Sequence, residues 1–325
     1  MKESNYGYVV VTDYFSADGK EDVSQKIQNL IDENPNKTIF FPDGKYLLSH
    51  PILTPADPEK SVELRLSNFA CLIASENWDH EEAMVCLGAK DPANNIGVPG
   101  SNYGICGGFI DANGKAVAIS IDGGRETFIR ELNIKNAKIG LHINHGANSG
   151  SSDADVFNVN IVGNGSADSI GVLIDGFDNT LTNMRIANVF TGVVVRSGGN
   201  MLRNIHPLYY VNPNITNYHE SVGFRIENGM NWFDYCYSDQ YAVGFETEGG
   251  GVMKNCFCWW YSGADKLHLA VKSLNPFYGS IDTLVIGGEE HPESPKQFME
   301  APEITSTATI RDVRICKKDG TEKVY

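Results

Sequence analysis

Two carboxylates in one short segment are the side chains with the clearest capacity for chemistry. Asp234 and Asp239 lie within the aromatic segment Trp232–Asp239. Cleavage of a glycosidic bond commonly needs one carboxylic acid that protonates the leaving oxygen and one carboxylate that acts as base or nucleophile. Five residues of straight strand span roughly 16 Å, whereas such a pair lies roughly 5–9.5 Å apart. The two residues therefore pair with each other only if the chain bends at Ser238.

Other acidic residues are alternative partners for Asp234 or Asp239. The candidates are Asp153 or Asp155, Glu246 or Glu248, or a carboxylate of a neighbouring subunit. Asp153 and Asp155 are also the only pair that we consider for calcium, together with loop carbonyl groups, although two acids alone are a weak signal. The alternative interpretation is that these side chains are solvated surface acids, because the chain has 41 Asp and Glu residues.

One histidine and one arginine complete the polar candidates. His206 could orient a substrate or act as acid or base, since the unperturbed histidine pKa lies near neutrality, but its neighbour Pro207 also suits a structural role. Arg185 could bind a sugar hydroxyl or carboxylate, or pair with an acid. We predict that catalysis involves Asp234, Asp239, His206, Asp153 and Asp155.

Aromatic residues are frequent around these polar groups. Trp259, Trp260 and Tyr261 are adjacent, so at least one large ring is expected to face outward. Aromatic faces stack on sugars and also build subunit interfaces, and both interpretations stay open. The predicted substrate-binding residues are Arg185, Tyr235, Tyr237, Tyr209, Tyr210, Trp259, Trp260 and Glu246.

An internal repeat indicates the elements that must position these residues. A Gly-apolar-x-apolar strand recurs from Gly140, Gly171, Gly192, Gly223 and Gly244, with flanking versions at Ala118–Ile121 and Leu267–Ala270. The basic spacing is 21 to 23 residues, and two units carry an insertion of about ten. A period near 20 with strands and turns is typical of a β-solenoid. We expect Ile143, Ile174, Val195 and Ile226 to share one buried column, and buried asparagines to form ladders in the turns.

A second strand in each unit carries the candidate residues. Aligning the repeats gives one outward column of Asn133, Asn160, Arg185, His206, Tyr237 and Cys258, and a neighbouring column of Glu131, Asn158, Asn183, Asn204, Tyr235 and Cys256. The insertions at 144–155 and 207–219 border this strand, so they either wall a cleft or are tolerated surface loops.

The N-terminal segment reads differently from the repeats. Apolar residues at Val23, Ile27, Leu30 and Ile31 predict one amphipathic helix over 22–33, with Asp22 near its start. A short strand at 38–41 and a turn at 42–44 follow.

Three motifs resemble those of the pectate-lyase superfamily. They are the entry segment Asp13–Asp22, the segment Phe40–Leu47, and the coil Gly107–Gly114. The resemblance covers roughly residues 9–290 and implies a right-handed parallel β-helix with a helix capping its N-terminal end and a carbohydrate groove along its side. Members of this superfamily include lyases, glycoside hydrolases, transferases, esterases and phage tailspikes, so the fold alone does not select an activity. The polygalacturonase motifs are absent from the sequence.

The composition and net charge of the chain limit the classes of ligand and partner that we expect. With 26 Lys and Arg against 41 Asp and Glu, the net charge of −15 repels polyanions, so nucleic acid and anionic membranes are not expected and a neutral glycan is favoured over an acidic one. Seven cysteines without paired zinc-site spacing predict free core thiols. No cofactor is predicted. Met1 leads into polar residues, which predicts a cytoplasmic protein, or a secreted or periplasmic one if a leader has been removed.

The predicted fold is all-β, a single right-handed parallel β-helix domain over 1–325. Residues 1–59 form the N-terminal cap segment, 60–290 the coils, about nine or ten in number, and 291–325 the C-terminal cap. The predicted function is cleavage or rearrangement of glycosidic bonds in a neutral glycan, as a glycoside hydrolase or a fructosyl-type transferase. The alternatives are a polysaccharide lyase that uses Arg185, Tyr237 or His206, and a non-catalytic glycan-binding or structural protein. A homo-oligomer is expected, with a trimer as the favoured form.

Overall fold

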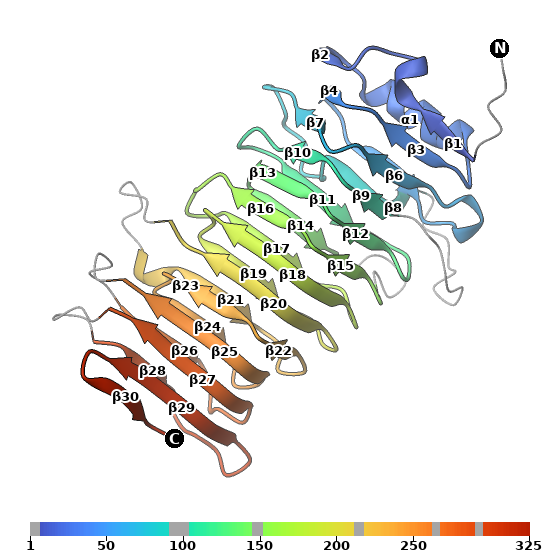
Figure 1. Ribbon diagram of the computed structural model, residues 1–325. Helices are drawn as coiled ribbons and strands as arrows, with labels where there is room; N and C mark the ends of the chain where they lie inside the picture. The colour runs from blue at the N-terminus through green and yellow to red at the C-terminus, as the bar shows by residue number, and fades with distance from the viewer. Residues whose placement is uncertain (1–6, 91–103, 145–151, 211–217, 262–266, 290–294) are drawn as a thin grey trace. The chain divides into compact units, whose positions relative to one another are not determined.

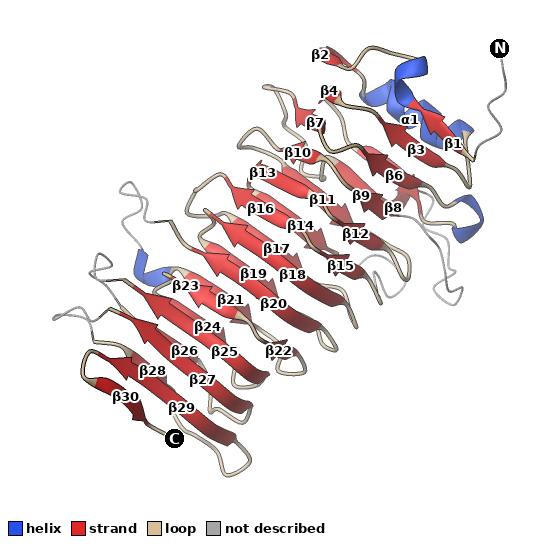
Figure 2. Ribbon diagram, viewed as in Figure 1, coloured by secondary structure: helices blue, strands red, loops and turns tan. Residues whose placement is uncertain are grey.

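The chain folds into a right-handed parallel β-helix with an N-terminal α-helix (Figures 1 and 2). The computed structural model describes residues 7–90, 104–144, 152–210, 218–261, 267–289 and 295–325. It divides into two compact units, Met1–Ile161 and Val162–Tyr325, and each consists of stacked parallel strands. The predicted fold class is therefore confirmed, whereas one domain over 1–325 stays a prediction.

Unit 1 contains the α-helix and the first sixteen strands of the described residues. Their bounds are β1 (Tyr8–Val10), β2 (Asp18–Asp22), α1 (Ser24–Glu33), β3 (Thr38–Phe41), β4 (Gly44–Leu48), β5 (Ile52–Pro55), β6 (Glu63–Leu66), β7 (Ala70–Ala74), β8 (Val85–Lys90), β9 (Gly104–Cys106), β10 (Phe109–Asp111), β11 (Val117–Ile121), β12 (Phe128–Arg130), β13 (Asn133–Ala137), β14 (Ile139–Ile143), β15 (Asp155–Phe157) and β16 (Asn160–Gly163), in which the division falls; short 3-10 helices lie at Val11–Asp13 and Pro58–Lys60.

Unit 2 contains the remaining strands. Their bounds are β17 (Ile170–Ile174), β18 (Thr180–Ala187), β19 (Thr191–Val195), β20 (Met201–Leu208), β21 (Val222–Ile226), β22 (Trp232–Asp234), β23 (Tyr237–Asp239), β24 (Val243–Thr247), β25 (Val252–Trp260), β26 (Leu269–Ser273), β27 (Ser280–Gly288), β28 (Gln297–Glu300), β29 (Thr309–Lys317) and β30 (Gly320–Lys323), with a 3-10 helix at Tyr218–Glu220.

Helix α1 forms where the amphipathic stripe predicts it. Ile27, Leu30 and Ile31 are buried, as expected for residues one helical turn apart. The side chain of Gln28 donates to the carbonyl of Leu53 and accepts from its amide at 3.0 and 2.8 Å. These two bonds join the helix to β5, so the expected packing of the helix against the start of the coils is confirmed.

Each coil contributes one strand to one sheet and one or two strands to the other. In unit 2, β17, β19, β21, β24, β26 and β28 pair in parallel and form the first of these sheets. Ile174, Val195 and Ile226 pair in register and are buried, as is Ile143 in unit 1, so replacement of one by a charged residue would bury that charge. The predicted core positions are confirmed within each unit.

From the coil of Glu131 onward, the other sheet bends in each coil at a non-glycine residue with left-handed backbone conformation. These residues are Glu131, Asn158, Asn183, Asn204, Tyr235, Asn255, Thr283 and Asp312, with φ between 49° and 65°. Asparagine tolerates this conformation better than most residues, which explains why it dominates the column. The side chain of Asn204 also donates to that of Asn183 at 3.0 Å, so part of the column is a hydrogen-bonded ladder.

A second asparagine ladder is fully buried in unit 2. Asn179, Asn200 and Asn231 precede successive strands and have no exposed surface. The side-chain amide of Asn179 donates to Asn200 at 2.9 Å, and that of Asn200 donates to Asn231 at 3.1 Å. The same oxygens accept the backbone amides of Asn179 and Asn200. The ladder therefore satisfies buried backbone groups from one coil to the next.

The register differs from the sequence alignment in the last coils. Tyr237 pairs with Phe257, so the outward column continues with Phe257, and the predicted assignment of Cys258 was wrong. Asn255 in turn occupies the bend position that was predicted for Cys256. Both cysteines point inward and are buried. Likewise Phe245 pairs with Val271, which makes Ala270, not Leu267, the equivalent of Gly244.

The parallel pairing also extends beyond the predicted coil bounds of 60 and 290. Strand β3 pairs with β6, and β4 pairs with β7, so the coils begin before residue 60. At the other end β27 pairs with β29, and the antiparallel strand β30 closes the edge of β29. Within the described ranges, no helix has the length and hydrophobicity that crossing a membrane requires.

Candidate functional site

A row of four rings lies on the outer face of β20, β23 and β25 in unit 2. The rings of His206 and Tyr237 stack at 4.0 Å with an interplanar angle of 16°. Tyr237 meets Phe257 edge to face at 5.1 Å, and Phe257 stacks against Trp259 at 6.0 Å. We call these four residues the aromatic row. Because successive coils lie one strand spacing apart, outward side chains at equivalent positions come into contact along the stack.

Asp239 lies beside the aromatic row and, among the residues that the structure describes, is the carboxylate that contacts it. Its Oδ2 accepts a hydrogen bond from the Tyr237 hydroxyl at 3.1 Å and lies 3.4 Å from Nε2 of His206. Its Oδ1 is buried and has no hydrogen-bond partner among the described residues. A buried carboxylate oxygen without a donor is costly, and Oδ1 of Asp239 can still accept a hydrogen bond.

The tyrosine beside Asp239 is held in its protonated form. Burial raises the pKa of Tyr237 well above its ordinary value, and the neighbouring charge of Asp239 and the hydrogen bond to it raise this pKa further. Tyr237 is therefore a hydrogen-bond donor at neutral pH and is poorly suited to act as a base. This argument concerns proton transfer only, because the ring face of Tyr237 still contributes to the aromatic row.

Trp259 is the most exposed member of the aromatic row, with 37% of its surface accessible. It pairs with Asp239 on one side and with Gly287 of β27 on the other. A Cβ atom at Gly287 would lie 2.9 Å from the Trp259 ring and from the Phe257 ring. Because Gly287 has no side chain, both rings can lie close to the backbone of the next coil.

Two further residues extend this surface. Arg185 of β18 pairs with His206 in the sheet and is exposed, and its Nη1 donates to the carbonyl of Met184 at 3.1 Å. Tyr235 is 55% exposed and takes φ 53° at the bend position. A bulky residue in left-handed conformation is strained, and such strain concentrates at functional positions. Tyr235 is therefore a candidate functional residue, because an asparagine would fit the same backbone conformation better.

Asp234 occupies a different column from Asp239. It lies in β22 before the bend at Tyr235, where it pairs with Arg203 on one side and Lys254 on the other. Its Oδ2 lies 3.7 Å from Arg203 Nε, and its Oδ1 accepts from Asn255 at 3.3 Å. The column continues with Asp282 and Arg311. The alternating signs indicate that Asp234 stabilises neighbouring coils by charge pairing.

Asp153, Asp155 and Glu246 form ion pairs, whereas Glu248 accepts a hydrogen bond from the side chain of Asn275 at 2.6 Å. In unit 1, Asp153 lies 2.7 Å from Arg125, and Asp155 lies 2.6 Å from Arg130. In unit 2, Glu246 belongs to β24 of the other sheet, where it accepts from Arg225 at 2.9 Å and Lys272 at 3.3 Å. Glu246 is 8% exposed. The structure therefore does not bring Glu246 to the aromatic row.

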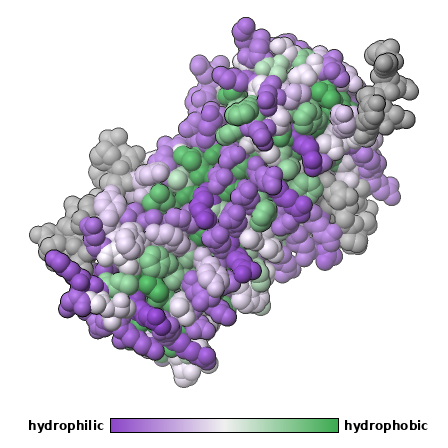
Figure 3. All heavy atoms as spheres, viewed as in Figure 1, coloured by the Kyte–Doolittle hydropathy of each residue, from purple (hydrophilic) through white to green (hydrophobic). Residues whose placement is uncertain are grey.

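The predicted aromatic residues divide into buried and exposed ones. Tyr209 and Trp260 are buried, and Trp260 Nε1 donates to the carbonyl of Tyr241 at 2.6 Å, so these rings belong to the core. Tyr210 is exposed. The parts of the two predicted insertions at 145–151 and 211–217 lie outside the described residues. In Figure 3, hydrophilic side chains cover much of the visible face, and smaller apolar areas lie between them.

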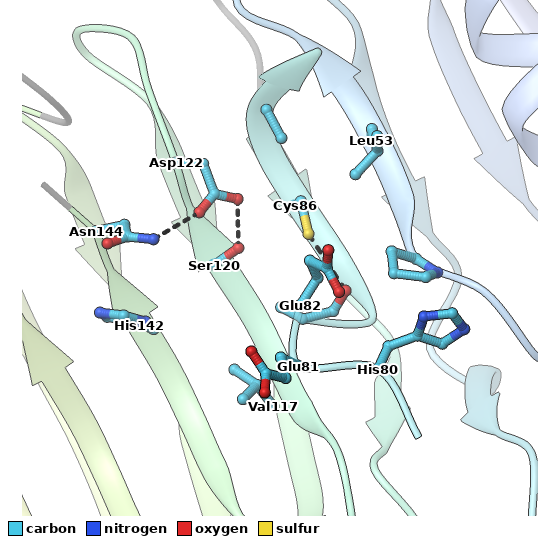
Figure 4. A pocket seen from close by; sticks show the side chains of 13 residues that line it. Leu53, His80, Glu81, Glu82, Cys86, Val117, Ser120, Asp122, His142 and Asn144 are labelled. Atoms are coloured by element: carbon cyan, nitrogen blue, oxygen red, sulfur yellow. Dashed lines mark hydrogen bonds between the residues drawn. The ribbon is translucent and has the colours of Figure 1, made fainter. Parts of the chain in front are cut away.

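A cavity of about 650 Å³ lies on the sheet of unit 1 that contains β5, β8, β11 and β14. Cys86, Ser120 and His142 pair in register across its floor. Asp122 accepts from the Ser120 hydroxyl at 2.6 Å and from the Asn144 amide at 3.0 Å, as Figure 4 shows. Burial and the charge of Asp122 raise the pKa of Cys86 to about 12. The thiol therefore stays protonated near neutral pH and is not a nucleophile.

Sequence reasoning missed two parts of these sites. The sequence alignment placed Cys258 at the outward position that Phe257 occupies, an error of one residue. Asn255 is the signal that would have corrected the alignment, since asparagine marks the bend in neighbouring coils. The cavity was missed because its floor residues occupy the variable position of the Gly-apolar-x-apolar strand. That position holds Ser120 and His142 in unit 1 but Val194 in unit 2.

Among the described residues, no three His, Cys, Asp or Glu side chains are arranged to hold a metal ion.

Comparison with solved structures identifies proteins of the same fold. The chain is similar to ORF18 of Geobacillus virus E2, with a TM-score of 0.65 and 14% identity over 95% of this chain and 61% of that one. It is similar to the catalytic unit of the GH87 α-1,3-glucanase from Streptomyces thermodiastaticus strain HF3-3, with a TM-score of 0.51 and 13% identity over 96% of this chain and 68% of that one.

A third similar structure is a variant tailspike protein of the E. coli bacteriophage HK620. Its TM-score is 0.59 at 11% identity, over 96% of this chain and 66% of that one. The chain thus spans less than two thirds of the length of both the virus E2 protein and this tailspike. No protein-family model matches the chain, and no curated protein matches it in sequence. At these identities the likeness establishes a parallel β-helix fold shared with phage proteins and a glucanase.

Proposed function

We propose that the protein binds a neutral glycan along the aromatic row. The observation that carries this proposal is the row itself, in which the exposed ring of Trp259 lies on the strand next to Asp239, and Asp239 contacts Tyr237 and His206. Aromatic faces bury the apolar face of a sugar, while nearby polar groups bind its hydroxyls. The similar fold of an α-1,3-glucanase and of a tailspike supports a glycan as ligand. The net charge of −15 favours a neutral glycan over an acidic one.

We further propose that Asp239 takes part in cleavage of a glycosidic bond, with His206 as its neighbour in proton transfer. Asp239 is the carboxylate that contacts the aromatic row among the described residues, and its Oδ2 lies 3.4 Å from Nε2 of His206. Among the described residues that contact the row there is one carboxylate, so a second acid or base would come from His206. General acid or base assistance contributes roughly 10²–10⁴-fold to a rate.

A polysaccharide lyase is the second candidate, because Arg185, His206 and Tyr237 lie on adjacent strands. An elimination needs a base for the proton next to a uronate carboxylate, and an arginine could bind that carboxylate. The raised pKa of Tyr237 argues against tyrosine as this base and leaves His206 for the role. The products distinguish the two reactions, since an elimination leaves an unsaturated uronate.

The test is an activity assay on matched variants. Asp239→Asn, Asp234→Asn and Asp282→Asn would be compared with the parent on neutral fructans, glucans and xylans and on uronate polymers, after thermal unfolding has shown that each is folded. We expect Asp239→Asn to lose roughly 10²–10⁴-fold in reducing-sugar release. Asp234→Asn and Asp282→Asn, both from the charge-paired column, should retain the parent rate. Full activity of Asp239→Asn on a substrate that the parent cleaves would show that the carboxylate assignment is wrong.

A further inference from the structure

The cavity of unit 1 has the dimensions and shape of a small-molecule site. Its volume of about 650 Å³ falls within the range of roughly 300–1,000 Å³ that is usual for ligand pockets. Strand residues form the floor, the segment between β7 and β8 lies on one side, and Asp122 and Asn144 lie on the other (Figure 4). The aromatic row contributes no residue to this cavity.

The charged residues that line the cavity determine whether it attracts a cationic or an anionic ligand. Glu81, Glu82 and Asp122 all line it, whereas no lysine or arginine is among its described lining residues. Neither Glu81 nor Glu82 forms an ion pair with another residue that the structure describes. The carboxylates therefore repel an anionic ligand and attract a cationic one.

Two hydrogen bonds hold Asp122 in a fixed orientation at one side of the cavity. Ser120 is 4% exposed and donates to Asp122 Oδ2, while Asn144 donates to Oδ1. Each oxygen has a second lone pair that can accept from a ligand. Leu53 and Val117 also line the cavity and supply apolar surface. An ammonium group can reach the acid while the attached carbon skeleton contacts this apolar surface.

We propose that this cavity binds a small organic amine, with the ammonium group at Asp122 and a second contact to Glu82 at the rim. Two sources share this chemistry: an amino sugar with a free amine, and an aliphatic polyamine. A hydrogen bond between an ammonium and a carboxylate is stronger than one between neutral groups, so loss of the ligand's charge should weaken binding strongly. This site is independent of the glycan function proposed above.

Isothermal titration calorimetry on the full chain tests the proposal with glucosamine, putrescine, N-acetylglucosamine and calcium chloride. We expect glucosamine or putrescine to bind and N-acetylglucosamine, whose amine is acylated and neutral, to bind at least about tenfold more weakly. Tighter binding of glucosamine identifies an amino sugar as the source, and tighter binding of putrescine identifies a polyamine. Equal affinity for glucosamine and N-acetylglucosamine, or binding of calcium without binding of either amine, would overturn the proposal.

Three variants locate the binding. Asp122→Asn should weaken amine binding by about tenfold or more, because it removes a charge-assisted hydrogen bond. Glu82→Gln changes an exposed rim residue and should weaken it several-fold even if Asp122→Asn fails to fold. Glu33→Gln, at the exposed end of α1, is the matched control and should bind like the parent. Unchanged amine affinity in Glu82→Gln together with unchanged affinity in a folded Asp122→Asn would exclude this cavity as the site.

Discussion

Asp234 and Asp239 are five residues apart in the sequence, but their contacts indicate different roles. Asp234 lies between Arg203 and Lys254 in a column of alternating charge, so its contacts explain its presence without any ligand. Asp239 has one oxygen bound by Tyr237, and its other oxygen is buried with no donor in the described part of the chain. A purely structural carboxylate would normally satisfy both oxygens. Asp239 is consequently the better candidate for a functional acid.

Tyr235 permits a prediction that separates stability from function. Replacing it by asparagine, the residue found at the equivalent bends Asn204 and Asn255, should relieve left-handed strain of about 1 kcal/mol and raise the melting temperature. If the exposed ring of Tyr235 contacts a glycan, the same change should weaken glycan binding. Calorimetric melting and glycan titration of Tyr235→Asn check both effects. A lower melting temperature would contradict the strain argument, and unchanged binding would remove Tyr235 from the site.

The elements of unit 2 are joined by hydrogen bonds that run across coils as well as along strands. Asn179, Asn200 and Asn231 connect three successive coils and satisfy backbone amides that are inaccessible to water. The frequency of asparagine near the turns predicted such ladders. The identity of the laddered residues could not be derived, because asparagines at the bends and in the buried turns look alike in sequence and differ only in burial.

Asn200→Ala should therefore be destabilising. The change removes the Asn200 oxygen that accepts the backbone and side-chain amides of Asn179, and it removes the side-chain donor to Asn231, while the backbone amide of residue 200 still donates there. These losses should cost roughly 1–3 kcal/mol in the free energy of unfolding. Chemical denaturation measures this loss. Asn275→Ala, at an exposed position of the same unit, is the control and should change stability by less than about 0.5 kcal/mol. Equal effects of the two substitutions would show that the buried ladder contributes little.

The start of α1 should make stability depend on pH. Burial tends to raise the pKa of Asp22, but hydrogen bonds from the side chain and backbone of Ser24 and from Ser49 outweigh it, so the pKa lies below its ordinary value of 3.8. A lowered folded-state pKa contributes stability above the unfolded-state pKa, and this contribution is lost as the pH falls through the folded-state pKa. Asp22→Asn should therefore melt below the parent at pH 7, and the difference should shrink below about pH 4.

Melting curves of Asp22→Asn between pH 3 and pH 7 would check this expectation. Glu33→Gln is the control, since Glu33 is exposed and lies at the other end of the helix. A difference between Asp22→Asn and the parent that stayed constant over this range would mean that the charge of Asp22 does not stabilise the helix start.

At the scale of the molecule, the repeat determined what could be predicted. A glycine-apolar pattern at 21 to 23 residues indicated the parallel coils and the buried positions of Ile174, Val195 and Ile226, because solenoid contacts are between equivalent residues of adjacent coils. Outward positions carry no such constraint. The sequence alignment was therefore wrong by one residue at Phe257, where the coil lengths change. It also gave no indication of the cavity beside Asp122. The trimer expected from the resemblance stays a prediction.

The most direct test of the account is equilibrium binding of neutral oligosaccharides to matched tryptophan variants. Neutral glucan, fructan and xylan oligosaccharides would be titrated into the parent, Trp259→Ala, Trp259→Phe and Trp232→Ala by calorimetry. Trp232 is 44% exposed but lies outside the aromatic row, so it controls for loss of an exposed ring. We predict that Trp259→Ala weakens binding about tenfold, that Trp259→Phe retains most of the affinity, and that Trp232→Ala binds like the parent. Equal affinities of the parent and Trp259→Ala for every oligosaccharide that binds would contradict a glycan site on the aromatic row.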